Sequence, residues 1–272
     1  MPGPLRKFFR DRGTHLAAMI AYYALLSFVP LVFLSLALLG LAGQQGASSY
    51  LVKELQRAFP DSSVSSIVSA VRGIQRHATA LGIIGGVGLL WTSIGLFSVL
   101  ESALNIVYGL PNRPFLRGKA LAIVLMIASL VTLFTGLVVG SIGFDVLKRY
   151  APGFVANVYV AYTVSVLASL AAVFLFVTSV YYLLTNVKLE FREVLPGAIT
   201  ASIALEASFQ ALPVYLRLSK NVVALQAFGG PVILLVWLYV MANVLVFGAE
   251  INSWRRARRL GPAGLEEAAG LA

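Results

Sequence analysis

The stretch FGGPVILLVWLYVMANVLVFGAEINSWRRARR, residues 228–259, contains a long apolar run that ends in a cluster of arginines. A helix needs about 20 mostly apolar residues to cross the hydrocarbon core of a bilayer, and basic residues commonly mark its end. One acid, Glu250, and one amide, Asn243, lie inside the run. Anchoring a helix requires no carboxylate at that point. The stretch therefore predicts a membrane-spanning helix with a polar face of its own.

The whole chain has the composition of an integral membrane protein. It has 272 residues, of which 59% are hydrophobic and 12% are charged, and its mean hydropathy is +0.86. A soluble domain carries about twice that charged fraction. The absence of cysteine excludes disulfides, iron–sulfur clusters and zinc–thiolate sites. The net charge of +10 comes from basic residues at the ends of apolar segments, which predicts contact with anionic lipids and no nucleic-acid partner.

The hydropathy pattern predicts an all-α polytopic membrane protein with six transmembrane helices. The predicted spans are residues 15–43, 79–108, 119–147, 154–186, 194–217 and 229–253. Pro30 lies inside the first span and removes a backbone donor, so we expect a kink there. Apolar residues at helical spacing predict an amphipathic loop over 44–78. We expect a single domain over 1–260 and a short flexible tail over 261–272.

The charge distribution predicts the orientation of the chain in the membrane. Six spans place both termini on one side, and that side holds the larger share of the lysines and arginines. The positive-inside rule then places both termini in the cytoplasm. The loop over 44–78 consequently faces outward.

Three acids inside the predicted spans are candidates for a substrate or proton pathway. Each lies on one helical stripe with an amide, at a spacing of four or seven residues. The pairs are Glu101 with Asn105, Glu206 with Gln210, and Asn243 with Glu250. An ionisable side chain at membrane depth costs about 2.5–3.5 kcal/mol on insertion scales unless it is paired or hydrated. The positions fit a polar cavity that opens to the cytoplasm, with Glu206 as the deepest acid.

Two of these acids have an alternative role. Glu101 and Glu250 lie near the cytoplasmic ends of their spans, where ion pairs would only fix the rim of the bundle. The candidate partners are Arg10, Arg12, Arg113 and the tail arginines. Glu206 has no basic residue near it in the sequence, which favours a functional role for it.

Enzymatic functions are disfavoured by the residues present. The chain has two histidines, His15 and His77, and neither belongs to a metal-binding pattern such as H-E-x-x-H. No P-loop, dinucleotide-binding glycine motif or G-x-S-x-G motif occurs. We expect no catalytic residue, no cofactor, no bound metal and no ATP-driven motor in this chain.

Four stretches resemble a known family. They are LAAMIAYYALLSFVPLVFLSLALLG (16–40), GLLWTSIGLFSVLESALNIVYG (88–109), VLPGAITASIAL (194–205) and FGGPVILLVWLYVMANVLVFGAEIN (228–252). In this order they resemble the YihY/BrkB family of bacterial six-span inner-membrane proteins, formerly labelled ribonuclease BN. The resemblance implies a multi-pass protein of the bacterial inner membrane, with export of lipid or another amphiphile as the expected activity. The ribonuclease label lacks support, because a metal-dependent nuclease needs a cluster of His and Asp.

The leading hypothesis is a transporter or flippase-like protein for a lipid or another amphiphilic or anionic solute, working without ATP. Arg113 and Arg117 are candidates for contact with anionic headgroups. The alternative is an envelope scaffold protein that transports nothing. The expected partners are the bilayer and its anionic lipids, and the sequence is compatible with a homo-oligomer.

Overall fold

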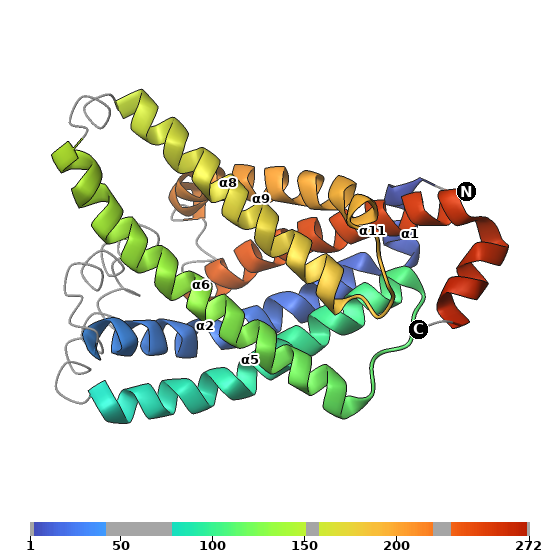
Figure 1. The fold of residues 1–272 in the computed structure, drawn as a ribbon, viewed down its shortest axis with the longest axis horizontal. Helices are drawn as coiled ribbons and strands as arrows, with labels where there is room; N and C mark the ends of the chain where they lie inside the picture. Colours follow the sequence, from blue (N-terminus) through green and yellow to red (C-terminus); the bar gives the residue numbers. More distant parts are fainter. Residues whose placement is uncertain (1–2, 42–77, 151–157, 220–229, 271–272) are drawn as a thin grey trace.

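A computed structural model describes residues 3–41, 78–150, 158–219 and 230–270. Within them the chain forms seven helices and no strand (Figure 1). The helices are α1 Pro4–Arg10, α2 Gly13–Leu41, α5 Ala78–Tyr108, α6 Phe115–Tyr150, α8 Val158–Leu184, α9 Phe191–Ser219 and α11 Gly230–Gly270. Apart from Ala78, the amphipathic loop predicted over 44–78 lies outside the described residues.

Each of the six long helices overlaps one predicted span, although α11 continues to Gly270, well beyond the predicted end at 253. Four of these helices contain windows that are long and apolar enough to cross a bilayer. The windows are Gly85–Tyr108, Phe115–Thr132, Val166–Leu184 and Pro231–Gly261. In α2 the described apolar stretch is shorter, Gly13–Phe28. Over the described residues the all-helical fold is confirmed, with four helices apolar enough to cross a membrane, whereas the number of six spans stays a prediction.

Helix α11 lies at the centre of the packing. It contacts α2, α9, α5 and the short α1, while α2 also packs along α5. Helix α8 packs on α9, and α6 packs on α5. Figure 1 shows α6 and α8 diverging from α2 and α5 toward the end away from α1. The helices are therefore gathered at the end that holds α1 and spread at the other end.

Small residues allow α9 and α11 to approach each other closely. A β-carbon on Gly197 would collide with the backbone carbonyl of Gly248 and with the Asn252 side chain. The amide N–H of Gly197 donates to Asn252 Oδ1 at 2.6 Å, and Asn252 Nδ2 donates to the carbonyl of Val194 at 3.0 Å. Close approach through small residues, with a polar side chain between the helices, is typical of packing in membranes. The contact fixes the first turns of α9.

Two residues bear on the continuity of the helices. Helix α2 continues through Pro30, and a β-carbon on Gly88 of α5 would lie 3.5 Å from its ring, an ordinary van der Waals contact. The kink expected at Pro30 stays a prediction. Gly261 has a φ of 68° and interrupts α11 at the start of the predicted tail, after which helical residues continue to Gly270.

Candidate functional site

Among the described residues, most polar contacts between helices lie at one end of the bundle, which we call the rim. The rim consists of α1, the last two turns of α5, the links 109–114 and 185–190, and residues 250–260 of α11 (Figure 1). Two of the three predicted acids, Glu101 and Glu250, lie here. The third, Glu206, lies deeper in the bundle. The site therefore has two parts, a charged rim and a buried acid below it.

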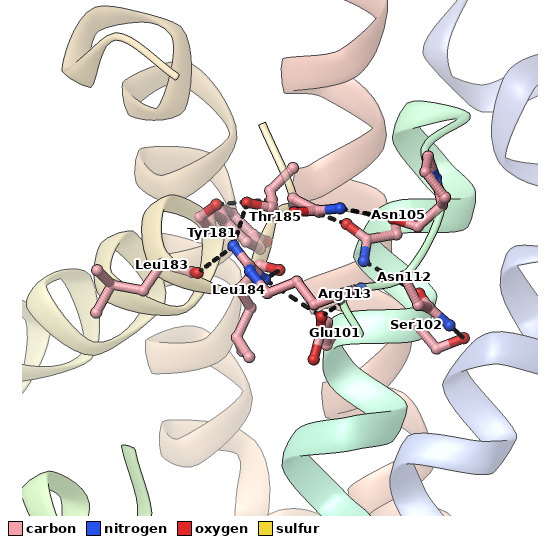
Figure 2. Close-up of polar contacts among 11 residues, drawn as sticks. Glu101, Ser102, Asn105, Asn112, Arg113, Tyr181, Leu183, Leu184 and Thr185 are labelled. Carbon is pink, nitrogen blue, oxygen red and sulfur yellow. Dashed lines mark hydrogen bonds and ion pairs between the residues drawn. The ribbon is translucent and has the colours of Figure 1, made fainter. Parts of the chain in front are cut away.

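Arg113 connects α5 to the end of α8 (Figure 2). Its guanidinium donates to the backbone carbonyls of Leu184 at 2.6 Å, Thr185 at 2.9 Å and Leu183 at 3.0 Å. The last carbonyls of a helix have no partner within the helix and carry partial negative charge, so a cation there is favourable. The same guanidinium lies 3.3 Å from Oε1 of Glu101, which also accepts from the Arg113 backbone N–H at 3.2 Å. Glu101 is thus held in an ion pair at the rim.

Asn105 joins the two links of the rim instead of supporting Glu101. Its Nδ2 donates to Asn112 Oδ1 at 3.0 Å, and its Oδ1 accepts from the backbone N–H of Asn186 at 2.8 Å (Figure 2). Asn112 in turn donates to Ser102 at 3.2 Å. The side chain of Asn105 is fully buried. A buried amide with its donor and acceptor both used fixes the geometry of its surroundings.

Glu250 forms an ion pair with Lys7 of α1 at 2.6 Å. The Lys7 ammonium also donates to Asp11 at 2.7 Å and to the backbone carbonyl of Val107, at the end of α5, at 2.6 Å. Glu250 is completely buried. Lys7 was not among the expected partners of Glu250, which were all arginines. Asn243, two turns away, donates to the carbonyl of Tyr239 in its own helix at 2.7 Å.

Several polar atoms in the interior of the rim have no hydrogen-bond partner among the described residues. Oε1 of Glu250, the hydroxyl of Tyr108 and Nε1 of Trp254 are buried without a hydrogen-bond partner among the described residues. An unpartnered polar atom in the interior costs about 1–3 kcal/mol. A rim of this kind is held by strong ion pairs but is not fully satisfied, which is compatible with rearrangement.

A further network at the start of α9 was not found from the sequence. Glu193 lies 2.7 Å from Arg259 and 3.6 Å from Arg256, and its other oxygen accepts from the backbone N–H of Glu190 at 3.0 Å. Glu190 directly precedes α9, and a glutamate three residues after such a position is a known capping arrangement. That spacing was a signal in the sequence, but the arginine partners lie far away along the chain.

Glu206 is the buried acid below the rim. It accepts hydrogen bonds from Ser169 Oγ of α8 at 2.7 Å and from Gln210 Nε2, one turn along α9, at 2.8 Å. It is 6% exposed, and no cation pairs with it in the part of the chain that the structure describes. Fifteen residues separate it from the start of α9, or about 22 Å at the rise of an α-helix. The predicted proximity of Glu206 and Gln210 is present.

The remaining candidates have different surroundings. Arg117 is exposed at the start of α6, and Arg113 is mostly engaged by protein groups, so contact of either with lipid headgroups stays a prediction. Across the described ranges, no group of three or more His, Cys, Asp or Glu side chains is placed to hold a metal ion.

The sequence matches one protein family and several bacterial proteins. The profile of the family described as virulence factor BrkB matches residues 5–269. The ribonuclease-like protein YfkH of Bacillus subtilis is 24% identical over 93% of this chain and 94% of its own length. A UPF0761 membrane protein of Rhodospirillum rubrum is 30% identical over 97% of this chain and 61% of its own length. A UPF0761 membrane protein of Rhodospirillum centenum is 28% identical over 95% of this chain and 59% of its own length.

The chain spans less than two thirds of the length of the two UPF0761 relatives. No solved structure matches it.

Proposed function

We propose that this chain, a membrane protein belonging to the family described as virulence factor BrkB, moves a lipid or another amphiphilic or anionic solute across the bilayer without ATP. It would do so in the bacterial inner membrane with both termini in the cytoplasm. Glu206 would be the central polar group, and the rim would be the gate on the side of the termini.

The observation that carries this proposal is the environment of Glu206. A carboxylate at this depth, hydrogen-bonded only to the neutral groups of Ser169 and Gln210 by the described residues, gains no compensation from a cation. Such a residue is expensive to place in a membrane, and ionisable groups inside membrane segments are commonly parts of substrate or proton pathways. A proton or a cationic group of a substrate would supply the missing compensation.

The rim supports the proposal in a second way. Glu101 and Glu250 are used in ion pairs with Arg113 and Lys7, which join α5 to α8 and α1 to α11. In alternating access, one end of a bundle closes while the other opens around a site near the midplane. The gathered rim and the diverging far ends of α6 and α8 fit a conformation closed at the rim (Figure 1).

The paired acids of the rim also favour a second candidate, an envelope scaffold that transports nothing. In that case Glu101, Glu250 and Arg113 would only hold the helices together. Ribonuclease activity is not part of either proposal. Neither histidine of this chain belongs to a metal-binding pattern that a metal-dependent nuclease would need.

The test is lipid movement in vesicles that contain the purified chain. Fluorescent phosphatidylglycerol is placed in both leaflets, and a membrane-impermeant reductant bleaches only the label that reaches the outer leaflet. We expect faster bleaching of the inner pool than in protein-free vesicles. Glu206→Gln should slow this movement at least about tenfold, since the substitution removes an interaction needed for function.

The matched control is Glu267→Gln, which removes the same charge in the part of α11 after Gly261, outside the rim. Gln at position 206 keeps an acceptor for one donor, and the Ser169 hydroxyl is able to reverse its hydrogen bond, so the fold should persist. Equal rates for vesicles with and without protein would favour the scaffold. A Glu206→Gln protein that moves lipid normally would remove Glu206 from the mechanism.

A further inference from the structure

A cavity of about 450 Å³ lies in the rim beside Arg113. It is formed by the last turn of α8 and the 185–190 link, and its polar lining includes Tyr182, Asn186 and Lys188. Ligand pockets in proteins commonly have volumes of about 300–1,000 Å³. The cavity is therefore large enough for a small headgroup.

The lining of this cavity is cationic. Two of its residues, Arg113 and Lys188, carry positive charge, and none is acidic. The charge of Arg113 is largely offset by Glu101 and by the carbonyls at the end of α8. Lys188 is exposed, and among the described residues nothing pairs with its ammonium group. The unpaired charge of the cavity therefore belongs to Lys188.

One wall of the cavity continues onto the lipid-facing surface of α8. Tyr182 and Leu183 are 46% and 42% exposed and lie at the end of the apolar window Val166–Leu184. The end of such a window is at the level of the lipid headgroups, where tyrosine is favoured. The cavity thus has a charged side toward the link and an apolar side toward the bilayer.

The link is held in place before any ligand arrives. The backbone N–H of Asn186 donates to Asn105 Oδ1 at 2.8 Å, and Asn186 Nδ2 donates to the carbonyl of Pro111 at 3.0 Å. The Arg113 guanidinium holds the three preceding carbonyls. A site whose backbone is already fixed loses little entropy on binding.

We propose that this cavity binds the headgroup of an anionic phospholipid from the adjacent leaflet. Lys188 contacts the phosphate, and the acyl chains leave along Tyr182 and Leu183. A free phosphate ester shares the charged chemistry but would gain nothing from the exposed apolar surface. The role of the cavity as an entry site for lipid rests on the proposed function. Lipid binding at the cavity does not, because binding and lipid movement are measured separately.

The test is lipid binding by the full chain in detergent, measured by native mass spectrometry with added phosphatidylglycerol or phosphatidylcholine. The variants are Lys188→Gln and Arg192→Gln, which remove the same charge four positions apart. Only Lys188 lines the cavity. We expect a preference for phosphatidylglycerol in the wild type, and Lys188→Gln to bind it about fivefold more weakly than Arg192→Gln does. Lys188→Arg should retain binding.

Equal weakening by Lys188→Gln and Arg192→Gln would overturn the proposal, because the effect would then be general surface charge. Binding of free glycerol phosphate without any preference for phosphatidylglycerol would also overturn it, in favour of a soluble anion. Loss of lipid binding in Lys188→Gln with unchanged lipid movement would support the site and separate it from transport. Intact binding in Lys188→Gln with loss of movement would overturn the site and leave the proposed function standing.

Discussion

Replacing Arg113 with glutamine removes the side chain that joins α5 to the end of α8. The change deletes guanidinium hydrogen bonds to three carbonyls and leaves Glu101, which is 5% exposed, with only a backbone N–H donor from residue 113. Removing one partner of a buried ion pair costs about 3–5 kcal/mol. In a chain of this size, a loss of that order lowers the thermal midpoint by about 10 °C.

The assay is thermal unfolding of the purified protein in detergent, followed by circular dichroism. Arg117→Gln is the matched control, because Arg117 is exposed four residues further along and should change stability by no more than about 0.5 kcal/mol. The double variant Arg113→Gln with Glu101→Gln should recover part of the loss, since it no longer leaves an unpaired charge. Equal midpoints for Arg113→Gln and Arg117→Gln would refute the role of this contact. A double variant no more stable than Arg113→Gln would refute the orphaned charge as the cause.

Two further predictions concern the packing of α11. Lys7→Gln leaves the completely buried Glu250 without its cation and should lower the free energy of unfolding by about 3–5 kcal/mol. The same thermal midpoint measures the loss, and adding Glu250→Gln should recover part of it. An unchanged midpoint would mean that α1 does not hold the rim. Gly197→Ala places a methyl group against the Gly248 carbonyl and should lower the free energy of unfolding by about 1–3 kcal/mol or more. Gly86→Ala should be tolerated, because a β-carbon on Gly86 has no neighbouring atom within 4 Å. Similar midpoints for the two alanine variants would contradict the close approach of α9 and α11.

The helices could be predicted from the sequence because the signal for them is local. The predicted span 79–108 and the observed α5, Ala78–Tyr108, agree within a residue, since an apolar run and its polar boundaries suffice to define a membrane helix. The proximity of Glu206 and Gln210 could also be predicted from the sequence, because residues four apart share a helix face.

The partners of the rim acids depend on tertiary packing and were harder to predict. Glu101 was expected at the rim with Arg113 as one of several partners, which is the pair that forms. Lys7 and Glu250 lie 243 positions apart, and no local pattern indicates which of many basic residues pairs with a given acid. The role of Asn252 between α9 and α11 likewise follows from the close approach of two helices.

Movement of solute is proposed to depend on the carboxylate of Glu206. The most direct measurement is the ratio of lipid-movement rates in vesicles containing equal amounts of folded Glu206→Gln and wild-type protein. The buried carboxylate with neutral partners predicts a ratio of about one tenth or less, with Glu267→Gln near the wild-type rate. A Glu206→Gln rate equal to that of the wild type would contradict the role assigned to Glu206.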